Sequence, residues 1–157
     1  MTELFKQARD QAQEGLNETR LALYTLRTVE ADKIRGIDSV QKLVRVFEKA
    51  TGVVVNMDLG NITWNFDESV ELTLYRLVQE GNSFRHGKAT RIEISFEQEI
   101  SARTLRICDN GSGCNEIRDG IGFSGIKERV GKLGGHFTAR NKSAGFELSA
   151  WIPCKVR

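Results

Sequence analysis

Apolar residues recur at spacings of three and four over residues 2–29, which predicts one long amphipathic helix. The apolar seam consists of Phe5, Ala8, Ala12, Leu16, Thr19, Leu23 and Leu26. The other faces carry charged and amide side chains, and no proline interrupts the run. Two interpretations follow. The helix either lies on its own domain or belongs to a helical bundle or dimer, for which the small residues of the seam leave room.

Shorter periodic segments follow after Gly36. The pattern predicts a helix from Asp38 or Ser39 to Thr51, a strand at 53–59, a helix from Asp67 toward His86, strands at 91–96 and 104–108, a helix at 126–133, and strands at 136–140 and 146–152. Turn residues separate these elements, with Gly52 suited to the end of the first of these helices. This order predicts an α+β two-layer sandwich, in which helices cover one face of a mixed sheet.

Composition agrees with one globular domain. The chain has 157 residues, of which 39% are hydrophobic, so intrinsic disorder of the whole chain is excluded. Lys and Arg number 23 against 21 Asp and Glu, a net charge of +2, which argues against a nucleic-acid partner. The apolar runs are too short to span a bilayer, and residues 1–30 are too polar for a secretion signal.

The cysteines and histidines do not form a recognisable framework. Cys108, Cys114 and Cys154 are odd in number and lack paired spacing, and His86 and His136 lie 50 positions apart. A disulfide scaffold and a zinc site are therefore not expected. The pattern favours free thiols in a reducing cytosol.

Two glycine clusters carry the first candidate chemistry. One spans residues 109–114 directly after a predicted strand, and the other spans 120–125 directly before a predicted helix. The second fits Gly-x-Gly-x-x-Gly, but it does not follow the first strand of a βαβ unit, so we reject a Rossmann site. A helix beginning at Gly125–Ile126 would aim free amides at an anion, with Lys127 in its first turn. The alternative is a mobile glycine-rich surface loop.

Asp109 adds a second candidate function to the first cluster. A carboxylate at a strand end accepts a hydrogen bond from an adenine amino group, and Gly111 and Gly113 let the chain pass flat against the base. The alternative is a turn aspartate, because Asp-Asn-Gly is a strong turn sequence.

A third constellation lies at the end of the predicted helix that starts at Asp67. Asn82 offers a carbonyl oxygen of the kind that Mg²⁺ accepts, and Arg85 offers donors to phosphate. Glu80 and His86 are the candidate catalytic groups of this segment. His86 is equally suited to a structural role at the helix C-terminus, where it would interact with the dipole.

Together these motifs resemble the nucleotide-binding boxes of sensor histidine kinases. Residues 109–114 and 120–130 resemble the G1 and G2 boxes, and residues 75–80 with 82–86 resemble the N box. The subgroup that it resembles most is the nitrate-sensor and membrane-fluidity-sensor type. The resemblance covers residues 36–153 and rests on three motifs in the expected order.

The resemblance implies a Bergerat-type ATP-binding fold of the GHKL superfamily, with ATP and Mg²⁺ as ligands. It implies that Asp109 binds the adenine amino group and that Gly111 and Gly113 shape the adenine pocket. Arg85 and Lys127 are expected near the phosphates, and Asn82 is expected on the metal. The implied lid hinge and phosphate cradle consist of Gly120, Gly122 and Gly125.

The resemblance also divides the chain. Residues 1–33 resemble the second helix of a dimerisation and phosphotransfer bundle, and residues 34–157 resemble the ATP-binding catalytic domain. The N box departs from the family pattern, because Glu80 and Asn82 are two positions apart instead of four. Two positions place side chains about 200° apart on a helix. The departure puts Glu80 in question more than Asn82.

The expected function is therefore that of a histidine-kinase catalytic domain. Neither His86 nor His136 is followed by an acidic residue, so the phosphoacceptor histidine is expected outside this chain. Expected partners are a response regulator and the kinase's own phosphotransfer helix, in a full-length homodimer that is anchored to the membrane and places this part in the cytoplasm. Two alternatives stay open: an anti-sigma-type protein-serine kinase, and a non-catalytic dimerising module with a vestigial pocket.

Overall fold

The computed structural model describes most of the chain beyond residue 35. The described residues are 4–9, 11–12, 15–16, 19, 36–61, 63, 66–83, 89–113 and 121–154, and the side chains of 80–83 and 121–122 lie outside the description. Five strands form one sheet: β1 (Val54–Asp58), β2 (Arg91–Gln98), β3 (Ala102–Asp109), β4 (His136–Asn141) and β5 (Phe146–Pro153). Their order is β1-β2-β3-β5-β4. β1 pairs in parallel with β2, and the other pairs are antiparallel, which confirms the predicted mixed sheet.

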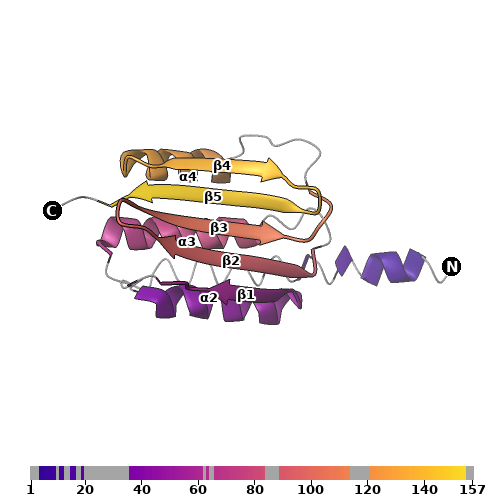
Figure 1. The fold of residues 1–157 in the computed structure, drawn as a ribbon. Helices are drawn as coiled ribbons and strands as arrows, with labels where there is room; N and C mark the ends of the chain where they lie inside the picture. Colours follow the sequence, from indigo (N-terminus) through magenta and orange to yellow (C-terminus); the bar gives the residue numbers. More distant parts are fainter. Residues whose placement is uncertain are drawn as a thin grey trace.

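Within the described residues, three helices form the second layer. They are α2 (Gly36–Thr51), α3 (Glu68–Ser83) and α4 (Ile121–Lys132). α3 contacts both α2 and α4, and all three lie behind the sheet in Figure 1. The predicted α+β two-layer sandwich, with helices on one face, is confirmed.

The core lies between these two layers. The apolar stripe predicted for α2 is buried, with Phe47 fully inaccessible to solvent. On the sheet, alternation directs one set of side chains to the helices, as Ile92, Ile94 and Phe96 of β2 show. Burying a large apolar side chain contributes about 1.5–3 kcal/mol, so this shared interface holds the layers together.

Several element boundaries differ from the sequence prediction by one or more residues, and three of the differences are informative. α2 begins at Gly36, which places Asp38 in the first helical turn instead of at its start. β3 begins at Ala102, two residues before the predicted strand, because Ala102 continues the ladder opposite Pro153. α4 begins at Ile121 instead of at Gly125–Ile126. Because glycine has low helix propensity, the sequence prediction leaves the first glycine-rich turn out of this helix. In the structure, the apolar contacts of Phe123 with the core stabilise this turn as helix.

The described part of the N-terminal segment is helical and exposed. Residues 4–9, 11–12, 15–16 and 19 are in helical conformation, as the long helix predicted. Among the seam residues, Phe5 is 71% exposed and Leu16 is 45% exposed, so the seam does not pack on the sandwich at these positions. Leu23 and Leu26 lie outside the described residues. Within the described ranges, no helix is both long enough and apolar enough to cross a membrane.

The start of α3 provides a test of how its sequence forms a helix. Asp67 accepts a hydrogen bond from the Val70 amide at 3.1 Å and one from the Ser69 hydroxyl at 2.6 Å. Replacing Asp67 by Ala should lower the free energy of unfolding by about 1 kcal/mol, because the first turn loses its cap. Asp67→Asn should retain most of the stability, since Asn caps helices equally well. Urea denaturation of the two variants checks this, and equal losses would contradict the capping role.

Candidate nucleotide site

Four segments that carry the predicted motifs meet at one end of the sheet. β3 ends there at Asp109, and α3 runs toward the same end before β2 begins at Arg91. The turn between β4 and β5 also lies at this end, on the right of Figure 1, and α4 runs away from this end toward the start of β4. The topology therefore brings together segments that are far apart in sequence, such as the end of α3 at Ser83 and the turn that precedes β5 at Phe146.

Asp109 lies at the last position of β3, on the face that the helices cover. It pairs in register with the buried Ile92, and strand alternation places it on the same face as Ile107. Its Oδ1 accepts a hydrogen bond from the Gly111 amide at 2.8 Å. Within the described part of the chain, no hydrogen bond to Oδ2 is found. One carboxylate oxygen is thus held by the turn, and the other has acceptor capacity for a ligand.

Asn110 fixes the same turn from the neighbouring position. Its Oδ1 accepts hydrogen bonds from the amides of Thr90 and Arg91, each at 2.9 Å, and its Nδ2 donates to the Thr90 hydroxyl at 2.9 Å. These bonds join the end of β3 to the start of β2. The sequence prediction did not select Asn110 as a site residue, although Asn in a turn often binds backbone amides in this way.

Gly145 approaches the backbone of Asp109 closely. A Cβ atom on Gly145 would lie 1.8 Å from the Asp109 carbonyl oxygen and 3.0 Å from its Oδ1, and its φ of 93° disfavours any other residue. A Cβ on Gly113 would lie 2.7 Å from Asn141 Oδ1. The β4–β5 turn therefore packs directly on the Asp109–Gly113 segment.

α4 joins the site from the side of the second glycine cluster. Phe123 is buried and contacts Phe137 and Phe146, with ring centroids 5.6 Å and 6.4 Å apart. Because α4 begins at Ile121, its first turn consists of residues 121–124. Gly125 lies one residue beyond this set, and exposed Lys127 lies in the second turn instead of the predicted first turn.

The other predicted site residues are covered only in part. Glu80 and Asn82 lie in the last turns of α3, and their side chains are outside the description. Gly122 lies near the start of α4. Arg85, His86, Gly120 and Cys114 fall outside the described residues, so their roles stay predictions. Cys108 and Cys154 are free thiols, as expected.

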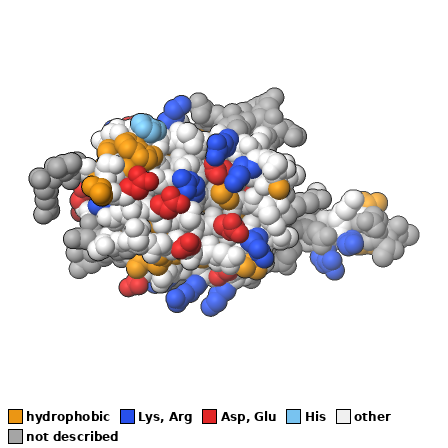
Figure 2. Space-filling model, viewed as in Figure 1, with side chains coloured by type: hydrophobic (Ala, Val, Ile, Leu, Met, Phe, Trp, Pro, Cys, Tyr) orange, Lys and Arg blue, Asp and Glu red, His pale blue; other side chains and the backbone are white. Residues whose placement is uncertain are grey.

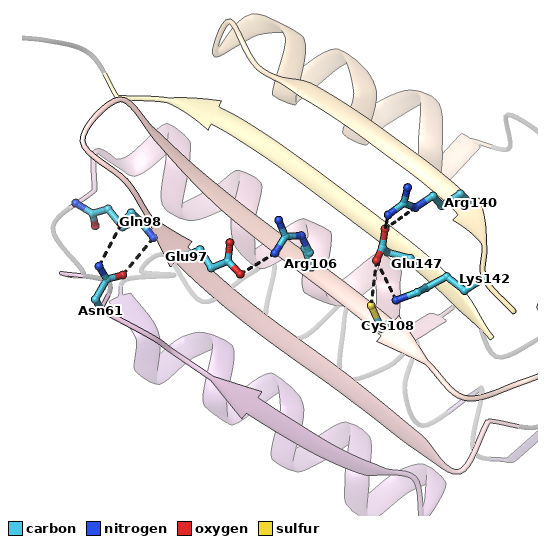
Figure 3. Close-up of polar contacts among 8 residues, drawn as sticks. All are labelled: Asn61, Glu97, Gln98, Arg106, Cys108, Arg140, Lys142 and Glu147. Carbon is cyan, nitrogen blue, oxygen red and sulfur yellow. Dashed lines mark hydrogen bonds and ion pairs between the residues drawn. The ribbon is translucent and has the colours of Figure 1, made fainter. Parts of the chain in front are cut away.

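The helix-free face of the sheet carries a charged cluster that the sequence did not predict. We call it the Glu147 cluster: Arg140, Lys142 and Glu147 from the β4–β5 hairpin and Cys108 from β3 (Figure 3). Arg140 Nε and Nη2 lie 2.6 Å and 2.5 Å from Glu147 Oε1. Lys142 Nζ lies 3.4 Å from Oε2, and the Cys108 thiol donates to Oε2 at 3.5 Å.

Glu147 is a buried carboxylate, with a side chain that is 6% exposed. Burial alone raises its pKa, but the hydrogen bonds from Arg140, Lys142 and Cys108 outweigh this effect and place the pKa below its ordinary value. Burial raises the pKa of the Cys108 thiol, and the Glu147 carboxylate adds to this, while Lys142 opposes it. Cys108 therefore stays protonated and serves as a donor.

The same face has two shallow hollows beside this cluster. One has a volume of about 530 Å³ and the other about 580 Å³, and both are bordered by Glu93, Cys108 and Lys142. Figure 2 shows this face, on which acidic and basic side chains are interspersed. Among the described residues, no group of three or more His, Cys, Asp or Glu side chains is arranged to hold a metal.

Asn110 should be needed for the stability of the turn at the site. Asn110→Ala removes three hydrogen bonds and should lower the free energy of unfolding by about 1–2 kcal/mol. Ser112→Ala, two positions along in the same turn, is the control and should change it by less than about 0.5 kcal/mol. Chemical denaturation checks both, and an Asn110→Ala protein as stable as the control would contradict the role.

Glu147 should stabilise the fold in a pH-dependent way. Its native pKa is lowered, so its contribution is complete above the unfolded pKa of about 4.3 and is lost as pH falls through the native pKa. At pH 7, the free energy of unfolding of the wild type should exceed that of Glu147→Gln by about 1–3 kcal/mol. This difference should shrink below pH 4. Glu128→Gln, which alters an exposed pair with Lys132, is the control and should change nothing measurable. A difference that grows on acidification would contradict this sign.

Comparisons with known proteins identify relatives among bacterial kinases. The chain is 35% identical over 148 residues to the signal transduction histidine-protein kinase/phosphatase DegS of Brevibacillus brevis, an alignment that covers 89% of this chain and 38% of DegS. It is 30% identical over 129 residues to the sensor histidine kinase LiaS of Bacillus subtilis (strain 168), covering 79% of this chain and 35% of LiaS. The chain thus spans little more than a third of these relatives. No protein-family model matches it.

Solved structures share the fold. The histidine kinase AdeS of Acinetobacter baumannii superimposes with a TM-score of 0.62 at 17% identity, covering 99% of this chain and 84% of that chain. The catalytic domain of the histidine kinase ThkA superimposes with a TM-score of 0.58 at 17% identity, covering 74% of this chain and 90% of that domain. Sequence and fold together place the chain in the sensor histidine kinase family, within the part that folds as the catalytic domain.

Proposed function

We propose that this chain binds ATP with Mg²⁺ at the end of the sheet where Asp109 lies, and that it delivers the γ-phosphoryl group to a histidine outside the chain. The observation that carries the proposal is the state of Asp109. Its carboxylate lies on the helix-covered face, and the Gly111 amide holds one oxygen. The second oxygen is then oriented to accept a hydrogen bond from the adenine amino group.

The turn around Asp109 supports base recognition. Asn110 fixes the backbone from the β2 side, and Gly145 packs against Asp109 from the β5 side. Because the acceptor is already fixed, little conformational entropy is lost when a ligand binds to it. This favours recognition of a specific base over binding of an anion in general. Gly111 and Gly113 let the backbone follow the base without a side chain in the way.

The phosphate and metal roles rest on the resemblance and on donor chemistry. Gly122 lies in the first turn of α4, which supports the phosphate cradle that we propose for Gly120, Gly122 and Gly125. Lys127 and Arg85 add positive charge near it. Asn82 would offer a hard oxygen to Mg²⁺, which neutralises phosphate charge when bound.

The transfer itself requires positioning more than covalent chemistry from this chain. The histidine nitrogen would attack the γ-phosphorus while the bond to the bridging oxygen breaks and ADP leaves. We place that histidine on a phosphotransfer bundle to which residues 1–33 contribute the second helix. The exposed seam residues Phe5 and Leu16 support this, because an apolar seam that does not pack on the sandwich is suited to another partner.

The proposed biological setting follows from the relatives. As for two-component sensor kinases generally, the partner would be a response regulator that accepts the phosphoryl group from the histidine. We place this part of the kinase in the cytoplasm, in a homodimer anchored to the membrane by other regions.

Calorimetry with a non-hydrolysable ATP analogue tests the proposal. Asp109→Asn should weaken binding about ten- to a hundredfold, because a charged hydrogen-bond acceptor of adenine becomes an amide. Asp58→Asn is the matched control. Asp58 accepts a hydrogen bond from the Gly60 amide at 2.8 Å, as Asp109 does from Gly111, but at the opposite end of the sheet.

Two further results separate the parts of the proposal. Mg²⁺ should tighten binding to wild type, and Asn82→Ala should lose that gain while it retains binding without metal. Equal affinities of Asp109→Asn and Asp58→Asn for the analogue would contradict the adenine site. A folded chain that binds no nucleotide would favour the non-catalytic module.

A further inference from the structure

The turn that touches Asp109 is held in place from the opposite face of the sheet. Gly145 could not carry a Cβ beside the Asp109 carbonyl oxygen, and the next residue but one is Glu147. Glu147 pairs in register with Cys108, the residue immediately before Asp109. Residues 145–147, the end of the β4–β5 turn and the start of β5, therefore contact both Asp109 and its chain neighbour.

Glu147 connects every strand that borders this turn. It accepts hydrogen bonds from Arg140 of β4 and Cys108 of β3, and an ion pair joins it to Lys142 in the turn itself. Lys142 also donates its amide to the Gly145 carbonyl at 3.0 Å. The side chain at the centre of this arrangement is 6% exposed, so its charge depends on these partners in place of water.

Phe146 fixes the same stretch from the other side. It is buried, and its ring stacks on Phe123 of α4 at 6.4 Å with an interplanar angle of 18°. Residues 145–147 thus contact the Asp109 backbone, the start of α4 and the charged cluster in succession. Because all three residues are held by contacts, a displacement of Glu147 is expected to move Gly145 as well.

We propose that Glu147 is a positioning residue for the nucleotide site: through the β4–β5 turn and Cys108, it holds the Asp109 carboxylate in the orientation that binds adenine. Glu147 lies on the helix-free face and does not itself contact the nucleotide. The inference rests on the proposed function of Asp109. It predicts that the charge of a residue on one face of the sheet tunes base recognition on the other.

A double-mutant cycle tests this on the whole chain. Binding of a non-hydrolysable ATP analogue with Mg²⁺ is measured by calorimetry for wild type, Asp109→Asn, Glu147→Gln and the double variant. Glu147→Gln should weaken binding about fivefold or more, and Asp109→Asn should cost less affinity in the Glu147→Gln background than in wild type. A structural role unrelated to Asp109 would give the same factor in both backgrounds.

Glu97→Gln is the matched control. Glu97 pairs with Arg106 at 2.7 Å on the same helix-free face, but toward the opposite end of β2. Glu97→Gln should leave the affinity for the ATP analogue unchanged. Asp109→Asn should therefore cost the same factor in affinity with and without Glu97→Gln. Arg140→Gln provides a second variant in case Glu147→Gln does not fold, since the Arg140 side chain is 68% exposed and its loss removes the closest cation of Glu147.

A spectroscopic readout reports the positioning directly. The Gly111 amide donates to Asp109 Oδ1, so its proton resonance should move in Glu147→Gln and Arg140→Gln and stay in place in Glu97→Gln. Additive losses in the cycle together with an unmoved Gly111 resonance would overturn the inference and leave the adenine site intact. An Asp109→Asn variant that binds like wild type would instead refute the proposed function, and the inference with it.

Discussion

The contact between Asp109 and Gly145 is the constraint on which this site depends. It joins the end of β3 to the β4–β5 turn at a distance that no side chain on residue 145 would permit. The Asp109 carboxylate accepts a hydrogen bond from the Gly111 amide, and the Asn110 side chain accepts hydrogen bonds from two amides at the start of β2. The sheet thereby presents an acceptor at the end of its central strand, and sites built on strands are held more precisely than sites on loops.

The two faces of the sheet serve different purposes. Apolar side chains on one face bury against α2, α3 and α4 and provide most of the stability. The other face is polar, and on it the buried Glu147 carboxylate pairs with Arg140. A buried ion pair is weak evidence for stability, because desolvation offsets much of the attraction. Its position next to Cys108 and Gly145 gives it a second consequence, which is to fix where the chain turns at Asp109.

The fold was predictable from sequence, whereas the network that surrounds the proposed adenine acceptor was not. The apolar stripe of α2, formed by Val40, Leu43 and Phe47, has the period of a helix, and the alternation in β2 has the period of a strand. These two patterns were sufficient to predict a helical layer and a sheet layer. Asp109 was identified because a motif surrounds it. Glu147 and Arg140 are 7 positions apart and look like ordinary strand charges, since only the pairing of β4 with β5 and of β5 with β3 brings them to Cys108. The start of α4 was placed too late because local glycine content outweighed the tertiary contacts of Phe123.

The central claim is that nucleotide binds on the helix-covered side at the Asp109 end of the sheet, and amide chemical shifts test it most directly. Titration of the isotopically labelled chain with an ATP analogue and Mg²⁺ should shift the amides of residues 109–113, of the last turn of α3 and of the first turn of α4. The same titration with a GTP analogue should shift them less. Shifts centred instead on Glu93, Ser95 and Arg106, beside the hollows of the helix-free face, would contradict the account.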